Sequence, residues 1–195
     1  MKTSGEFRTE LARKCIHLFI ALAPALAAVN RSNTALLLMG GVLFYTCAES
    51  LRFLGFSPPL ISSVTVAVSR KDKHGQFALA PVTLGLGALL SLLLFPQNAA
   101  SAAIYALAFG DSASALVGRF LGHVRPAFLS GKSLEGIMAC FAAAAISAYF
   151  VFHDWRTALA VGFASLLIDT LPLGDFDNLL MPMAAGAGAL IVSAL

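Results

Sequence analysis

Residues 110–136 read GDSASALVGRFLGHVRPAFLSGKSLEG, and they set charged side chains between two long apolar segments of the chain. The charged residues of this stretch are Asp111, Arg119, Arg125, Lys132 and Glu135. Ionisable side chains within a membrane segment are costly, and where they occur they usually mark a functional site. We therefore expect a membrane-embedded helix here that ends in a polar, functional region.

The composition of the whole chain is that of an integral membrane protein. Of 195 residues, 58% are hydrophobic and only 12% are charged, with a mean hydropathy of +0.84. Soluble domains carry roughly 25% charged residues. The sequence predicts an all-α, polytopic membrane bundle with a single domain over residues 1–195. The net charge of +3 is too small to indicate a nucleic-acid partner.

Apolar segments that can cross a membrane follow one another along the chain. They cover residues 15–29, 34–54, 77–95, 99–121, 134–152, 157–171 and 178–195. The segment 58–69 is shorter and more polar, which favours an interfacial or re-entrant placement over a further span. The run 15–29 follows basic residues and imitates a signal peptide, but the Glu10–His17 pattern occupies the junction and favours a first span instead.

The distribution of basic residues supports about seven transmembrane helices. If 58–69 does not span and the N-terminus is cytoplasmic, only Arg31 and Arg156 of the thirteen Lys and Arg residues lie outside. This arrangement also places the polar motifs at the cytoplasmic ends of their helices. We expect the protein in the cell inner membrane, with its polar site on the cytoplasmic face.

A helix over 110–122 aligns acidic and small residues on one stripe. Asp111, Ser114, Ala115, Gly118 and Gly122 recur at spacings of three and four. A close helix–helix contact explains the small residues but leaves the charge of Asp111 unexplained. Arg119 near the end of this helix suits a membrane-surface anchor and a phosphate ligand equally.

Residues 130–133, Ser-Gly-Lys-Ser, precede the next apolar helix. The free backbone N–H groups of a helix start favour phosphate, and Lys132 adds a positive charge. A P-loop is excluded because Pro126 stands where its first glycine is needed and no strand precedes it. An ordinary capped helix start with basic flanking residues is the alternative.

An acidic turn and a polar N-terminal helix face complete the motifs. Asp169, Asp175 and Asp177 flank a turn, and carboxylates there suit Mg²⁺, although a solvated acidic loop is the alternative. Near the N-terminus, one helical face carries Glu10, Arg13, Lys14 and His17. Its alternative reading is a salt-bridged entry into the membrane.

Four motifs, in this order, resemble the CTP-dependent lipid kinase family, which includes dolichol and polyprenol kinases, phytol kinase and the CTP-dependent diacylglycerol kinase of yeast. They are ELARKCIH, GDSASALVGRFLG, SGKSLEG and DTLPLGDFDN, and they cover most of the chain. CDP-diacylglycerol synthase is distantly similar but has a glycine- and histidine-rich signature that this sequence lacks. The family often has a glutamate at the position of Asp169 and another acidic residue before Asp177-Asn178. The spacing differs slightly in this sequence, which leaves the role of Asp175 open.

The resemblance implies transfer of the γ-phosphoryl group of CTP to the hydroxyl of a lipid alcohol, with Mg²⁺ as cofactor and CDP as product. The acceptor stays open between polyprenol or dolichol, phytol-like alcohols and diacylglycerol, and so does assembly into a homo-oligomer. Phosphatidate cytidylyltransferase activity is the alternative. A transporter or scaffold, a third class, fits less well, because its carboxylates belong near the bilayer midplane.

The resemblance also assigns roles to residues. Asp111, Asp169 and Asp177 are the expected metal ligands, and Asp111, Glu135 and Asp177 the expected catalytic residues, with the general base open between Asp111 and Glu135. The expected ligands of the nucleotide are Gly110, Ser114, Gly118, Arg119, Ser130, Gly131, Lys132, Ser133, Asn178, Arg13, Lys14 and His17.

Overall fold

The computed structural model describes residues 14–56, 77–129 and 131–194, and the regular structure in these ranges is entirely helical. The prediction of an all-α chain is therefore confirmed for the described residues. The segment 58–69 lies outside them.

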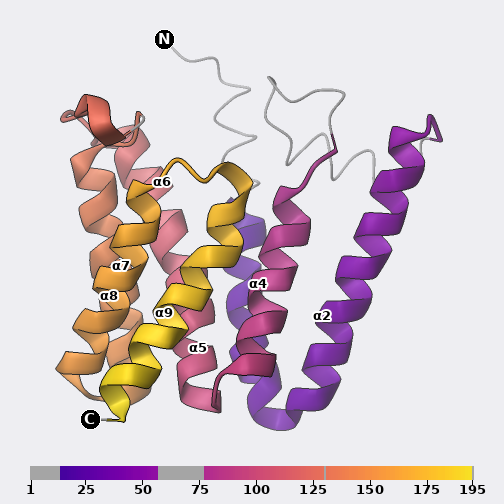
Figure 1. Ribbon diagram of the computed structural model, residues 1–195, viewed down its shortest axis with the longest axis horizontal. Helices are drawn as coiled ribbons and strands as arrows, with labels where there is room; N and C mark the ends of the chain where they lie inside the picture. The colour runs from indigo at the N-terminus through magenta and orange to yellow at the C-terminus, as the bar shows by residue number, and fades with distance from the viewer. Residues whose placement is uncertain (1–13, 57–76, 130, 195) are drawn as a thin grey trace.

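The first two predicted spans form one helical hairpin. Residues 14–19 are helical, a 3₁₀ turn follows at Ile20–Leu22, and α2 covers Ala23–Phe53. Asn30 breaks α2, because its backbone (φ −154°, ψ 103°) is not helical. Its side-chain oxygen accepts from the N–H of Asn33 at 2.9 Å and restarts the helix. The chain runs down, turns and rises again along α2 (Figure 1).

The other helices run up and down beside this hairpin (Figure 1). They are α4 (Ala80–Leu94), α5 (Gln97–Tyr105), α6 (Asp111–Phe120), α7 (Leu134–Phe152), α8 (Trp155–Thr170) and α9 (Asp177–Ser193). A π-helical turn, Ala106–Gly110, joins α5 and α6 into one helix over residues 97–120. This helix is the most buried of the candidate spans and packs against α2, α4, α7 and α9.

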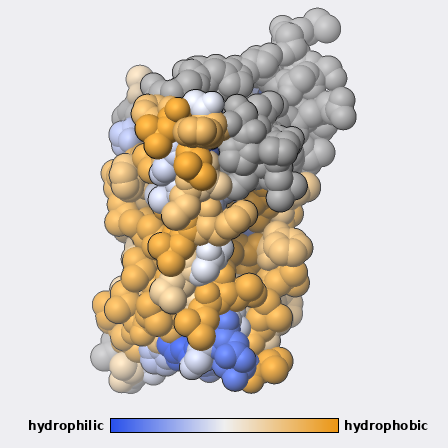
Figure 2. Space-filling view, turned by 90° about the vertical axis from the view of Figure 1, so that its right-hand side faces the viewer, coloured by the Kyte–Doolittle hydropathy of each residue, from blue (hydrophilic) through white to orange (hydrophobic). Residues whose placement is uncertain are grey.

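In the part of the chain that the structure describes, four helical stretches are long and apolar enough to cross a membrane: Lys14–Phe53, Gln97–Phe120, Leu134–Phe152 and Gly174–Ser193. The remaining helices α4 and α8 have 15 and 16 residues. At 1.5 Å per residue they rise only about 22–24 Å, less than a hydrocarbon core of about 30 Å. Apolar residues cover most of the described surface in Figure 2, with hydrophilic ones gathered at its lower end. The chain is thus a helical membrane protein.

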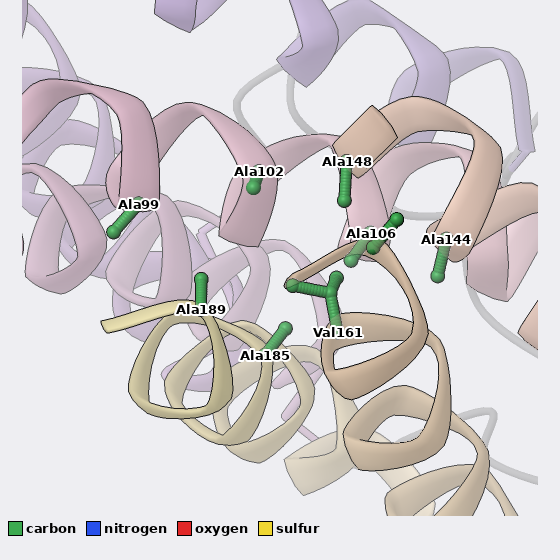
Figure 3. Close-up of a cluster of buried hydrophobic side chains, with 9 residues drawn as sticks. Ala99, Ala102, Ala106, Ala144, Ala148, Val161, Ala185 and Ala189 are labelled. Atoms are coloured by element: carbon green, nitrogen blue, oxygen red, sulfur yellow. The ribbon is translucent and has the colours of Figure 1, made fainter. Parts of the chain in front are cut away.

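Small side chains let the helices approach closely. The core between α5, α7, α8 and α9 is built almost entirely of alanine (Figure 3): Ala99, Ala102, Ala106, Ala144, Ala148, Ala158, Ala185 and Ala189, with Val161. Gly87 of α4 lies so close to α9 that a Cβ atom there would be 2.3 Å from the Asn178 carbonyl oxygen. Close packing of small residues is what drives helix association where no water is expelled.

The polar groups at the lower end of the bundle cap helices. Arg31 donates to the carbonyl oxygens of Leu92 and Phe95, the latter at 2.6 Å, where α4 ends. Asp154 accepts from the N–H of Thr157 at 2.9 Å at the start of α8. These contacts satisfy the free backbone groups at helix ends, so Arg31 and Asp154 have a structural role.

The Gly87 contact predicts a specific packing defect. Replacing Gly87 with Ala forces α4 and α9 apart and should cost about 1–3 kcal/mol of stability. Gly41→Ala is the matched control, because a Cβ atom there meets nothing within 4 Å. Thermal unfolding in detergent should show a lower midpoint for Gly87→Ala and an unchanged or higher one for Gly41→Ala. Equal midpoints would contradict the close α4–α9 contact.

Candidate functional site

The helix over residues 97–120 changes its winding directly before Asp111. The π-helical turn Ala106–Gly110 precedes it, and a Cβ atom on Gly110 would lie 3.3 Å from Cys140 Sγ of α7. Such turns are rare and frequently occur at functional sites. The Asp111 side chain is buried at this point, one helical turn before the buried Ser114.

Asp111 is paired with the N-terminal helical leg. Lys14 Nζ donates to Asp111 Oδ2 and, at 3.1 Å, to the Asp111 main-chain oxygen, while His17 Nδ1 lies 2.8 Å from Oδ2. Lys14 and His17 are each only 1% exposed. Their predicted shared face therefore turns inward and meets Asp111. Glu10 and Arg13 of the same motif lie outside the described residues.

Asp169 forms a second buried pair at the end of α8. Ser114 Oγ donates to Asp169 Oδ2 at 2.6 Å, and Lys132 Nζ lies 2.8 Å from Oδ1 and also donates to the Asp169 main-chain oxygen. Asp169 is 2% exposed. These contacts join residues 110–136 to the acidic turn, although the two segments are far apart in the sequence.

The two pairs form one cluster. Ser114 follows Asp111 by one helical turn on α6 and donates to Asp169, so it links the Lys14–Asp111 pair to the Lys132–Asp169 pair. A buried carboxylate is strongly unfavourable unless a cation compensates it. We call these four charged residues, with His17 and Ser114, the carboxylate–lysine cluster.

The small residues of α6 contact α7. A Cβ atom on Gly122 would lie 2.4 Å from Ser133 Oγ, and one on Gly136 would lie 2.7 Å from the Ser114 carbonyl oxygen. Gly118 would likewise meet Ser133 Oγ at 3.0 Å. The close helix contact considered for this stripe is therefore present. A role of Gly110 and Gly118 in nucleotide binding stays a prediction.

The loop before α7 ends in a helix cap, as the sequence predicts. Ser133 Oγ accepts from the N–H of Gly136 at 3.1 Å and caps α7. Gly131 has a positive φ of 90° and stands in open space. Arg125 donates to the carbonyl oxygens of Gly131 at 2.6 Å and Gly118 at 2.7 Å, which fixes the loop to α6. Ser130 lies outside the described residues.

Glu135 makes a structural contact for which the sequence carries no signal. Its carboxylate accepts from the backbone N–H groups of His123 and Val124, both at 3.0 Å. It thus holds the turn that follows α6. Arg119, in the last turn of α6, is half-buried and makes no hydrogen bond with the described residues.

The start of α9 connects to α4. Asn178 is buried, and its Nδ2 donates to Thr83 Oγ1 at 3.3 Å and to the Ala80 carbonyl oxygen at 3.4 Å. Asp177 is half-buried at the first position of α9. Within the described ranges, no three His, Cys, Asp or Glu side chains are grouped to hold a metal ion. The metal roles of Asp111, Asp169 and Asp177 stay predictions.

A third buried carboxylate lies outside these motifs. Glu49 of α2 is fully buried, accepts from Arg52 Nε at 2.8 Å, and accepts from the backbone N–H of Ala78 at 2.9 Å. The spacing of Glu49 and Arg52 predicts their pairing. It carries no signal for the contact with Ala78, which fixes the chain just before α4.

Two curated relatives are similar to most of this chain. The chain is 28% identical over 150 residues to CTP-dependent diacylglycerol kinase 1 of Eremothecium gossypii, which covers 73% of this chain and 47% of the relative. It is 27% identical over 158 residues to the protein of the same name from Saccharomyces cerevisiae, covering 77% and 53%.

The chain is similar to the CTP-dependent lipid kinases. The resemblance seen in the sequence is thereby confirmed, and CDP-diacylglycerol synthase is not favoured. The chain spans about half the length of the curated relatives it matches. No family model and no solved structure matches it.

The Lys132–Asp169 ion pair can be tested by a double-mutant cycle of unfolding free energies. Lys132→Met leaves a buried, uncompensated carboxylate and should cost about 3 kcal/mol. Adding Asp169→Asn removes that charge, so the double variant should be more stable than Lys132→Met alone. Chemical unfolding of the two single variants and the double variant measures the coupling. Additive losses would contradict a direct ion pair.

Proposed function

We propose that the chain transfers the γ-phosphoryl group of CTP to the hydroxyl of a membrane lipid alcohol and releases CDP. The observation that carries this proposal is the carboxylate–lysine cluster, buried within an apolar bundle in a chain that is similar to CTP-dependent diacylglycerol kinases. The names of the relatives favour diacylglycerol as acceptor over polyprenol.

We further propose that seven helical legs cross the membrane, with the cluster at the cytoplasmic side of the cell inner membrane. The distribution of basic side chains supports this orientation. Among the described residues, Arg52 stands at the end of α2, Arg119 at the end of α6, and Arg125 and Lys132 in the loop before α7; these helix ends lie at the upper end of the bundle in Figure 1. Arg31 follows the break at Asn30 and Arg156 stands in the first turn of α8; the turn of the hairpin and the start of α8 lie at the lower end in Figure 1.

In this proposal Lys14, Lys132 and Arg119 bind the triphosphate. Phosphoryl transfer demands mainly positioning and charge neutralisation, and lysines are common phosphate ligands. Lys14 reaches the cluster from the helical leg before α2 and Lys132 from the loop before α7, and Arg119 lies at the outer end of α6. Lys14 is fully buried, whereas the Lys132 side chain is about one third exposed.

The oxygen donors of the cluster fit Mg²⁺. Ser114 lies one helical turn after Asp111 and donates a hydrogen bond to Asp169. Two carboxylates and a hydroxyl are therefore close to one another. Mg²⁺ prefers one or two carboxylates together with substrate phosphates, so a preformed group of three carboxylates is not required. When bound, Mg²⁺ neutralises charge on the transferring phosphoryl group.

Asp111 is the proposed general base. Its carboxylate is buried beside Lys14 and His17, whereas the carboxylate of Glu135 is engaged by the turn after α6. As the lipid oxygen forms its bond to the γ-phosphorus, the hydroxyl proton moves to Asp111. The bond between the γ-phosphorus and the bridging oxygen breaks, and CDP leaves with that oxygen.

The test of the proposal is an assay of purified protein with γ-labelled CTP, Mg²⁺ and a panel of lipid alcohols. The label should appear on the lipid, with CDP as the nucleotide product. Release of pyrophosphate with phosphatidate as substrate would show cytidylyl transfer instead.

Asp111→Asn removes the proposed base and a metal ligand at once. We expect turnover to fall by about 10²–10⁴-fold, the usual range for a general base, while the protein remains folded in detergent. Steady-state kinetics with a parallel unfolding measurement checks this. A fully active Asp111→Asn protein would refute the assignment.

Glu135→Gln is the matched carboxylate-to-amide control. The amide keeps one oxygen that can accept from His123 and Val124, so turnover should stay within about tenfold of the wild type. An inactive Glu135→Gln beside an active Asp111→Asn would move the base assignment to Glu135.

A further inference from the structure

The Ser112 hydroxyl is a buried polar group that the proposed mechanism does not use. Ser112 directly follows Asp111 on α6 and is 3% exposed. Its Oγ atom has no hydrogen-bond partner among the residues that the structure describes. An unsatisfied buried hydroxyl is unfavourable, and such a group in a native protein calls for an explanation.

Other serines in this bundle show what Ser112 does not do. Ser91, Ser101 and Ser165 each donate to the carbonyl oxygen four residues earlier, at 2.7–2.8 Å. This bond normally satisfies a serine within an apolar helix. The residue four before Ser112 is Ala108, which belongs to the π-helical turn. The carbonyl oxygen that would accept from the Ser112 hydroxyl therefore lies in the part of the helix where the winding differs.

The two serines beside Asp111 point to different sides of the helix. At 100° per residue, Ser112 and Ser114 are about 160° apart around the axis. Ser114 donates to Asp169, on the side of Lys132 and the proposed nucleotide site. Ser112 thus faces away from that side. It also lies eight residues before the end of α6, about 12 Å deeper along the helix.

On the basis of the proposed function, we propose that Ser112 positions the acceptor lipid by donating a hydrogen bond to an ester carbonyl next to the reacting hydroxyl. Asp111 takes the proton of that hydroxyl, and Ser112 lies about 100° away around the helix, so it reaches a second oxygen. An isoprenoid alcohol has no second oxygen. The inferred substrate class is an acylated glycerol, such as diacylglycerol.

The test combines a side-chain change with a matching change in the lipid. Wild-type protein and Ser112→Ala are assayed with diacylglycerol and with its dialkyl ether analogue, which lacks the ester carbonyl. The wild type should prefer the ester by about three- to tenfold in kcat/KM, the range of one neutral hydrogen bond. Ser112→Ala should lower kcat/KM for the ester by the same factor, leave the ether unchanged, and leave the KM for CTP unchanged.

Ser91→Ala is the control, because it removes an equally buried hydroxyl that is bonded to Gly87. It should leave the ester-to-ether ratio unchanged. Ser112→Ala should unfold at the same temperature as the wild type or higher, since the lost hydroxyl had no partner.

Three results would overturn the inference: an ester-to-ether ratio near one in the wild type, a ratio that Ser112→Ala does not change, or a raised KM for CTP in Ser112→Ala. The wild-type ratio decides even where the variant does not fold. Absence of phosphoryl transfer by the wild type to any lipid alcohol would instead refute the proposed function.

Discussion

The structure depends on the compensation of two carboxylates buried among apolar helices. Asp111 and Asp169 are 9% and 2% exposed, and a buried charge left alone costs several kcal/mol. Lys14 compensates the first across 97 residues of sequence and Lys132 compensates the second across 37. Each ion pair therefore fixes a distant segment. The first holds the helical residues from Lys14 against the helix over residues 97–120, and the second holds the loop before α7 against the end of α8.

Close helix packing makes this arrangement possible. Alanine and glycine line the contacts of the helix over residues 97–120 with α7 and α9, so the backbones approach where larger side chains would separate them. The charged groups then meet at one end while the lower end carries helix caps. The candidate site is therefore the region of the buried ion pairs, because the polar groups at the lower end cap helices.

The sequence predicts the helical segments well, because apolar runs and their breaks are local properties. The gap between the predicted spans 15–29 and 34–54 coincides with the break at Asn30. The start of α7 at Leu134 follows from the capping residue Ser133. The shared face of Lys14 and His17 follows from their spacing of three.

The partners of these residues could not be predicted, because residue spacing within one motif carries no information on another. Neither the Lys14–Asp111 pair nor the bond from Ser114 to Asp169 has a local signal. The π-helical turn before Asp111, which packs against α7, likewise has no local signal. Glu135 shows the converse: its place in a motif suggested catalysis, whereas its contacts hold a turn.

The central claim is that the buried ion pairs act in catalysis as well as in folding. Exchanging the partners of one pair, with Lys132→Asp and Asp169→Lys in the same protein, tests it most directly. The exchange keeps an ion pair but removes a proposed metal ligand and moves the cation. We expect a folded protein, by thermal unfolding, that has lost phosphoryl transfer from CTP. Wild-type turnover per folded molecule would show that the pair serves folding alone.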